Sequence, residues 1–86
     1  MSLRPLDEAT LQVKQMAVAE DRRREGIGAR LLAHSEFWAR GAGFLLMVLN
    51  ARMGAEGFYV HFDYQAQGAP FDENTIPHIR MTKRLA

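Results

Sequence analysis

The sequence predicts an α+β domain, in which a mixed, mostly antiparallel sheet of about five strands carries a β-α-β unit and two main helices. Three observations lead to this prediction. Apolar residues recur at helical spacing over residues 26–42, an apolar run follows at residues 44–49, and shorter strand-like runs lie on either side of this pair. A strand, a long helix and a buried strand in this order are typical of a right-handed β-α-β unit.

The N-terminal residues predict an antiparallel hairpin. Residues 3–6 read as a short extended piece, residues 7–9 as a polar turn and residues 10–19 as a longer strand. In that strand Leu11 and Val13 share one face, whereas Met16 and Val18 have the opposite parity. A residue inserted near Lys14 would produce this change, which is the pattern of a β-bulge. A strand buried on both faces is the alternative.

An amphipathic helix is predicted over residues 26–42, with charged residues opposite one apolar stripe. The stripe consists of Ile27, Leu31, Leu32, Ser35, Trp38, Ala39 and Ala42. Gly41 and Gly43 signal the end of the helix. The following run, residues 44–49, is apolar throughout and predicts a central strand buried on both faces.

The remaining residues predict a second helix over residues 51–62, a short strand at 64–68, a loop at 69–75 and a final strand at 76–85. One side of the second helix carries Ala51, Ala55, Phe58 and Phe62. In the final strand one face carries Ile79, Met81 and Leu85, and the other carries His78, Arg80, Thr82 and Arg84.

The composition limits the functions that this chain can have. Its 86 residues make one domain, and a net charge of +1 gives no field that would favour nucleic acid or a membrane as a partner. The absence of cysteine excludes disulfides and thiolate chemistry, and it fits a reducing compartment. No apolar run has membrane-spanning length, and the three histidines have no metal-ligand spacing. We therefore expect a cytoplasmic protein without a bound metal.

The start of the long helix is a candidate anion-binding site. Residues 23–30 read RREGIGAR, so basic residues and two glycines stand where the helix begins. Glycine lets backbone N–H groups approach an anion closely, and a helix start offers unpaired donors at the positive end of its dipole. The run matches neither the dinucleotide fingerprint nor the P-loop. A plain tight turn is the alternative interpretation.

The same run matches the loop pattern of the GNAT superfamily of acetyl-CoA-dependent N-acetyltransferases, and three further segments agree in order and spacing. These segments are residues 16–18 (MAV), residues 48–52 (VLNAR) with the following GFY at 57–59, and the tail from Gly68 to Met81 with its Ile-Pro-His segment. The chain thus resembles this superfamily over roughly residues 11–85. The resemblance implies a single GNAT-like acetyl-CoA-binding domain at residues 1–86, corresponding to the C-terminal part of the family fold.

The resemblance also implies which residues bind acetyl-CoA. Backbone N–H groups of the helix-start loop would hold the pyrophosphate, the strand before it would line the pantetheine arm, and an N–H at Val18 would polarise the thioester carbonyl. The implied cofactor-binding residues are Met16, Ala17, Val18, Arg23, Arg24, Glu25, Gly26, Ile27, Gly28, Ala29 and Asn50. A side-chain contact of Arg22, Arg23, Arg24 or Arg52 with the phosphates is one interpretation of the basic run, and a solvated face is the other.

Two residues have implied catalytic roles. Asn50 matches an asparagine that hydrogen-bonds the pantetheine region, and Tyr59 matches a tyrosine that protonates the departing thiolate. A phenol is a reasonable proton donor to a thiolate of similar basicity. The alternative for Tyr59 is a core aromatic beside Phe58 and Phe62. Either His78 or Glu73 could serve as a base near the acceptor amine, or His78 could be a packed, hydrogen-bonded residue. His34 is expected to be structural, and His61, two positions after Tyr59, is expected to point elsewhere on the helix.

The chain also departs from the family pattern. Asp63 stands where the family commonly has a glycine after the second helix, and aspartate can adopt the left-handed conformation there at some cost. The chain begins where the family already has N-terminal strands and helices that shape the acceptor pocket. Its first strand would then be an uncovered sheet edge, and we expect a homodimer that covers this edge or contributes acceptor contacts.

The resemblance implies an enzyme that moves the acetyl group of acetyl-CoA to an amine acceptor by direct attack. The alternative is a non-catalytic module that binds acetyl-CoA or CoA, or a half-enzyme that needs a partner chain. A third possibility is an interaction domain without a ligand, in which the arginine run only solubilises the chain.

Overall fold

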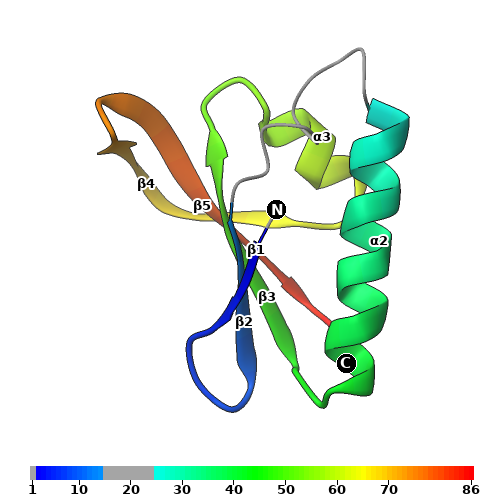
Figure 1. Ribbon diagram of the computed structural model, residues 1–86. Helices are drawn as coiled ribbons and strands as arrows, with labels where there is room; N and C mark the ends of the chain where they lie inside the picture. The colour runs from blue at the N-terminus through cyan, green and yellow to red at the C-terminus, as the bar shows by residue number, and fades with distance from the viewer. Residues whose placement is uncertain (1, 15–24) are drawn as a thin grey trace.

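The computed structural model describes residues 2–14 and 25–86, which form one five-stranded sheet and two helices (Figure 1). The strands are β1 (Ser2–Pro5), β2 (Thr10–Lys14), β3 (Leu46–Arg52), β4 (Gln65–Glu73) and β5 (Ile76–Arg84), and the helices are α2 (Glu25–Gly41) and α3 (Glu56–His61). The strand order is β1-β2-β3-β5-β4, and only β2 and β3 are parallel. The expected α+β fold with a central strand at residues 44–49 is confirmed, although that strand runs from Leu46 to Arg52.

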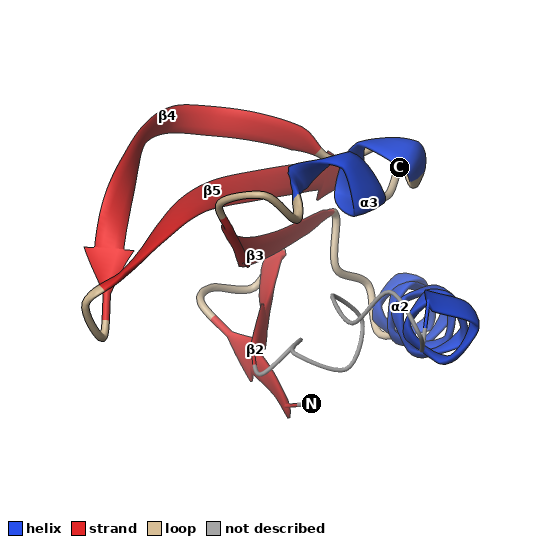
Figure 2. Ribbon diagram, turned by 90° about the horizontal axis from the view of Figure 1, so that it is seen from above, coloured by secondary structure: helices blue, strands red, loops and turns tan. Residues whose placement is uncertain are grey.

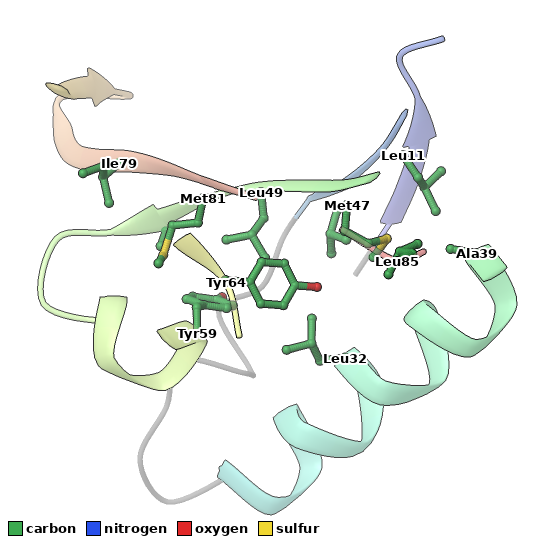
Figure 3. Packing of buried hydrophobic residues seen from close by; sticks show 12 residues of the cluster. Leu11, Leu32, Ala39, Met47, Leu49, Tyr59, Tyr64, Ile79, Met81 and Leu85 are labelled. Carbon is green, nitrogen blue, oxygen red and sulfur yellow. The ribbon is translucent and has the colours of Figure 1, made fainter. Parts of the chain in front are cut away.

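Both helices cover the same face of the sheet (Figures 2 and 3). Alternate strand residues point to this face and form the core with side chains from α2 and α3. The buried core consists of Leu11, Val13, Leu32, Ala39, Met47, Leu49, Ala51, Tyr59, Tyr64, Ile79, Met81 and Leu85. The predicted face of the last strand, with Ile79, Met81 and Leu85, is therefore confirmed. Neither described helix packs on the opposite face of the sheet.

The long helix buries a narrower stripe than the sequence predicts. Leu32, Ser35 and Ala39 are buried, whereas Ile27 and Trp38 are about half exposed at 52% and 50%. The Trp38 ring instead stacks on Phe44 beside the sheet, with 6.2 Å between the ring centroids. Of the predicted apolar stripe, Ile27, Trp38 and Ala42 are thus exposed, whereas the charged Glu36 is buried on the face directed to the sheet.

A buried polar network attaches α2 to the sheet. The Glu36 carboxylate is 5% exposed and accepts hydrogen bonds from Lys83 Nζ at 2.8 Å and from the Tyr64 hydroxyl at 2.9 Å. Arg40 lies 3.7 Å from the same carboxylate and donates through Nε to the carbonyl of Leu85. Burial and the charge of Glu36 raise the pKa of Tyr64, so this phenol remains a neutral donor.

The second helix is shorter than predicted. Its expected N-terminal part, from Ala51, belongs to β3, because β3 pairs with β5 as far as Arg52 opposite His78. The chain then turns at Gly54, whose φ of +102° is unsuited to a helix, and α3 begins at Glu56. The predicted helix over residues 51–62 was therefore wrong at its start, and the helix has only 6 residues.

The C-terminal hairpin also differs from the prediction. Residues 69–73, expected in a loop, continue β4, and the strand contains two residues more than its partner between Gln67 and Phe71. Gly68, with φ of +77°, lies in this bulge. Asn74 and Thr75 form the two-residue turn, both with positive φ, as in the type I′ turns that suit β-hairpins.

Asp63 adopts the expected left-handed conformation, with φ of +72°, just after α3. We expect Asp63→Gly to raise the free energy of unfolding by roughly 0.5–1 kcal/mol, since glycine has no Cβ penalty there and the negative charge leaves a helix C-terminus. Urea denaturation measures this change. Asp63→Ala removes the same charge without relieving the backbone, so a gain for alanine as large as for glycine would contradict the explanation.

Candidate active site

The start of α2 lies at the same end of the molecule as the C-terminal end of β3 (Figure 1). The helix begins at Glu25, so Gly26, Ile27 and Gly28 form its first turn, where backbone N–H groups have no partner within the helix. Gly26 and Ile27 are exposed, and a Cβ placed on Gly26 would meet no atom within 4 Å. This turn can therefore receive an anion. Of the predicted cofactor-binding residues, Met16, Ala17, Val18, Arg23 and Arg24 lie outside the described residues.

The described pairing of the two parallel strands stops before β3 ends. The last paired residues are Val13 and Leu49, although β3 continues through Asn50 to Arg52. On its other side this extension remains paired with β5, through Asn50 opposite Arg80 and Arg52 opposite His78. The end of β3 thus has one side without a described β-strand partner, and Asn50 lies at this point.

Three polar side chains from three strands meet on the face of the sheet opposite the helices. Asn50 Nδ2 donates to Glu73 Oε1 at 3.3 Å, and Glu73 Oε2 lies 3.5 Å from His78 Nε2. We call Asn50, Glu73 and His78 the polar triad. Asn50 Oδ1 is buried and has no hydrogen-bond partner in the part of the chain that the structure describes. A buried acceptor of this kind is costly unless a donor from outside the described residues reaches it.

The triad depends on the curvature of the β4–β5 hairpin. Glu73 pairs with Ile76, and Asn50 pairs with Arg80. In a flat sheet, four residues along a strand and two strand spacings would separate the Cα atoms of Glu73 and Asn50 by roughly 16 Å. That is more than their side chains and one hydrogen bond can span. The bulge at Gly68 bends β4, and Figure 2 shows the hairpin curving across the face of the sheet.

The ring of His78 is fixed in orientation. Nδ1 lies 2.7 Å from the carbonyl oxygen of Ile76, and because a carbonyl only accepts, Nδ1 carries a proton and donates it. The ring of Phe71 stacks on the imidazole with 6.3 Å between centroids. His78 is 8% exposed, as the packed interpretation of this residue expects, and its remaining nitrogen faces Glu73.

Tyr59 lies on the other face of the sheet from the polar triad. Its ring is fully buried in the core beside Tyr64 (Figure 3), and it packs edge to face on Phe58 and Tyr64 with 5.1 and 6.0 Å between the ring centroids. The two residues predicted to be catalytic, Tyr59 and Asn50, are therefore not brought together on one face. The packing agrees with the core-aromatic alternative, and the acid role of Tyr59 stays a prediction.

Other candidates lie near the site or away from it. Arg52 is exposed at the end of β3, close to the triad in register, and Arg22 lies outside the described residues. His34 and His61 are exposed on the helices, as expected of residues without a role in the site. A shallow surface depression of about 290 Å³ is lined by Asp63, Gln65, Thr82, Lys83 and Arg84, and it contains no predicted site residue.

Sequence reasoning named Glu73 and His78 only as possible bases and missed the contact of Glu73 with Asn50. The available signals were the glycine in β4, which marks a bulge, and the Asn-Thr turn that closes the hairpin. Within residues 2–14 and 25–86, no group of three or more His, Cys, Asp or Glu side chains is placed to hold a metal ion. In the same residues, no helix has the length and apolarity needed to span a membrane.

Comparison with solved structures identifies proteins of the same fold. A structure of a candidate N-acetyltransferase from Lactobacillus plantarum matches with a TM-score of 0.80 and 27% identity over 98% of this chain and 57% of that one. A GNAT family acetyltransferase from Elizabethkingia anophelis, solved with acetyl-CoA bound, matches with a TM-score of 0.74 and 24% identity over 95% of this chain and 65% of that one. An acyl-CoA N-acyltransferase from Pseudomonas aeruginosa matches with a TM-score of 0.68 and 23% identity, over 88% and 52% of the two chains.

Comparison at the level of sequence identifies a relative and a family model. The uncharacterized protein YyaT of Bacillus subtilis (strain 168) is 27% identical over 77 residues, which are 90% of this chain and 52% of that protein. The chain thus spans about half the length of this curated relative. The family model of the GNAT acetyltransferase domain matches residues 5–85, from the last residue of β1 to the end of the described core. Since that match takes in nearly the whole sequence and the fold agrees with it, this chain belongs to the GNAT acetyltransferase family.

Proposed function

We propose that this chain binds acetyl-CoA and transfers its acetyl group to an amine acceptor by direct attack. The match of the family model over residues 5–85 carries the proposal. The acetyl-CoA in the Elizabethkingia anophelis protein of the same fold supports the choice of ligand. The open first turn of α2 and the end of β3, which lie at the same end of the molecule, support a binding site between them.

In this proposal the ligand lies along the side of β3 that has no described strand partner beyond Leu49. Backbone N–H groups at the start of α2 bind the pyrophosphate, as helix N-termini bind anions. Asn50 Oδ1, which lacks a donor among the described residues, accepts a hydrogen bond from a pantetheine amide. The amine nitrogen then attacks the thioester carbonyl carbon, the C–N bond forms, and the C–S bond breaks with its electron pair on sulfur. The departing thiolate takes one proton, for which Tyr59 remains the proposed donor.

Calorimetry with acetyl-CoA and a thiol-release assay over a panel of amines test this function. We expect micromolar binding and amine-dependent thiol release. Absence of binding at high micromolar acetyl-CoA would remove the proposal. Full turnover by Tyr59→Phe would remove only the acid role of the tyrosine.

A second candidate is binding of acetyl-CoA without turnover by this chain alone. The observation that favours it is the length of the chain, which covers only 52–65% of the matched relatives. Tight binding with no thiol release, and activity that appears only when a partner chain is added, would support this candidate over the first.

We also propose a homodimer. β1 lies at one edge of the sheet, as predicted, and among residues 2–14 and 25–86 no strand pairs with its outer side, so its backbone groups there can pair with another chain. A second copy could cover the edge or add contacts to the acceptor. Sedimentation at micromolar concentration should show a dimer, and a monomer alone would contradict the proposal.

A further inference from the structure

The face of the sheet opposite the helices carries an excess of positive charge. The strand residues that point away from the core include five exposed basic residues, which we call the cationic face: Arg4, Lys14, Arg52, Arg80 and Arg84. On the described strands, the acidic residue of this face is Glu73, which is already in contact with Asn50 and His78. The whole chain has 11 basic and 10 acidic residues, so this excess of positive charge is local.

The charges of this face have little compensation from the described part of the chain. Within residues 2–14 and 25–86, Arg52 apart, no member of the cationic face forms an ion pair. On the helix side, by contrast, Arg40 and Lys83 both pair with Glu36, at 3.7 and 2.8 Å. Like charges gathered on one face repel one another and attract anions. The cationic face therefore suits a ligand with several negative charges and repels a polyamine.

The spacing of the charges indicates the size of that ligand. Arg84 is in register with Leu46, six residues before Arg52 on β3, and a strand rises by about 3.3 Å per residue, so roughly 20 Å separate the two arginines. Arg4 lies on β1, three strand spacings from β5, which corresponds to roughly 14 Å across the sheet. A small molecule does not span these distances, whereas an extended peptide of about six residues does.

The cationic face adjoins the site of the proposed reaction. Arg80 is the register partner of Asn50, whose Oδ1 is proposed to bind the pantetheine arm. From Arg80 the face continues along β5 to Arg84, which lies four residues or about 13 Å further along the strand. A peptide whose amine lies near Asn50 can therefore place carboxylates beside both arginines within about its first five residues.

The side chains of this face favour a peptide over a nucleic acid. Uncharged hydrogen-bonding side chains lie between the basic residues, namely Thr10, Gln12, Gln65, Gln67 and Thr82. Single-stranded nucleic acids bind by stacking on exposed aromatic rings, but Phe71, the aromatic residue of this face on the described strands, is stacked on His78. The proposed reaction also needs a nucleophilic amine. Peptides have one at the N-terminus, whereas the amino groups of nucleobases are delocalised into their rings.

We propose that the acceptor is the amino group of an acidic peptide segment, which docks on the cationic face through its carboxylates. This inference rests on the proposed function and specifies the class of its acceptor. The planar guanidinium groups of Arg80 and Arg84 bind carboxylates that follow the amine. The C–N bond forms at the neutral peptide amine, the C–S bond breaks, and one proton of the amine balances the thiolate as thiol. The charge of the residues after the amine then determines kcat/KM.

Three peptides of equal length test this specificity. Each has a free N-terminus as its one amine, followed by alanine alternating with glutamate, glutamine or arginine, and thiol release from acetyl-CoA gives kcat/KM. We expect the glutamate peptide to exceed the glutamine peptide by about tenfold at low salt, because each exposed ion pair contributes up to about fivefold. The preference should shrink at about 0.5 M salt, which screens exposed charges. Equal values for the three peptides, or a preference for arginine, would overturn the inference.

Variants locate the preference on the cationic face. Arg80→Gln should lower the ratio of kcat/KM between the glutamate and glutamine peptides by about threefold, and Arg80→Glu should abolish the preference. Arg30→Gln is the matched control, because it makes the same change of charge at an exposed residue of α2, on the helix side. Any effect of this control on acetyl-CoA affects both peptides equally, so the ratio should stay constant. An equal fall in the ratio for both Gln variants would contradict the assignment to this face.

Binding measured without turnover separates this inference from the proposed function. Fluorescence anisotropy of the glutamate peptide, labelled at its C-terminus, should show binding that Arg80→Glu weakens by about tenfold. A single-stranded oligothymidylate that binds more tightly than a peptide of equal charge would overturn the inference and assign the face to nucleic acid. A wild-type chain that acetylates all three peptides equally contradicts only the acidic acceptor. A chain that binds the glutamate peptide through Arg80 but releases no thiol with any peptide supports the docking surface and contradicts the proposed function.

Discussion

Glu36→Ala is expected to lower the free energy of unfolding by about 3–5 kcal/mol, the cost of removing one partner from a buried ion pair. Glu36 accepts from Lys83 Nζ and from the Tyr64 hydroxyl, and Lys83 is only 17% exposed. Alanine leaves the ammonium and the phenol between α2 and the sheet without their acceptor. A domain of this size has a free energy of unfolding of only about 5–10 kcal/mol, so the variant should lose a large part of its stability and unfold at a clearly lower urea concentration.

Urea denaturation followed by circular dichroism measures this loss, and two variants calibrate it. Phe37→Ala, at the adjacent helix position, removes a ring that is 77% exposed and should change stability by less than about 0.5 kcal/mol. Tyr64→Phe removes one hydrogen bond and should cost about 1 kcal/mol. If Glu36→Ala costs no more than Tyr64→Phe, the ion pair with Lys83 does not hold the helix to the sheet.

The same network gives stability a pH dependence. The pKa of Tyr64 is raised above the ordinary value of 10.0 by burial and by the charge of Glu36. A group whose pKa is raised in the folded state contributes stability fully below its unfolded value and loses it as the pH rises through the folded value. Unfolding should therefore become easier above pH 10. Tyr64→Phe should flatten this part of the profile, and an unchanged slope would show that another group causes it.

The sequence predicts the fold correctly where the local spacing of apolar residues decides which side chains are buried. Alternation placed Ile79, Met81 and Leu85 in the core, and helical spacing placed Leu32 and Ala39 there. The errors arose where distant pairing outweighs local pattern. Ala51 and Arg52 belong to a strand because β5 pairs with them, which no window of residues around position 51 reveals.

The candidate site was less predictable than the fold for a related reason. Asn50 could be placed by its position at the end of a strand, but its contact with Glu73 depends on the curvature of a hairpin 23 residues away. The curvature of the β4–β5 hairpin results from the bulge at Gly68 and from the turn. Neither feature allows the distance between Asn50 and Glu73 to be predicted from the sequence. The sequence indicates the contact of Lys83 more clearly, because alternation along the strand places Lys83 on the same face as Ile79 and Met81. A lysine on a core face requires an acidic partner, and Glu36 lies on the helix stripe that faces it.

Gly26→Asp is expected to weaken acetyl-CoA binding by about tenfold or more while it stabilises the fold. A carboxylate at this exposed position in the first turn of α2 would lie near the proposed pyrophosphate site. Two like charges at about 6 Å cost roughly 0.7 kcal/mol per pair even at the dielectric of water, and a diphosphate presents at least two. The fold should gain about 1 kcal/mol, because an acidic residue suits a helix N-terminus and glycine does not.

Gly26→Asn separates charge from size. Asparagine has nearly the shape of aspartate, and a side chain here has open space, since a Cβ would meet no atom within 4 Å. If the start of α2 binds the pyrophosphate, the asparagine variant should keep affinity within about threefold in calorimetry, and the aspartate variant should regain affinity as salt screens the repulsion. Equal losses in the two variants would indicate a steric block. Unchanged affinity in both variants would mean that the phosphates bind elsewhere. In water, a carboxylate at position 26 repels the phosphates strongly only when they lie close to it.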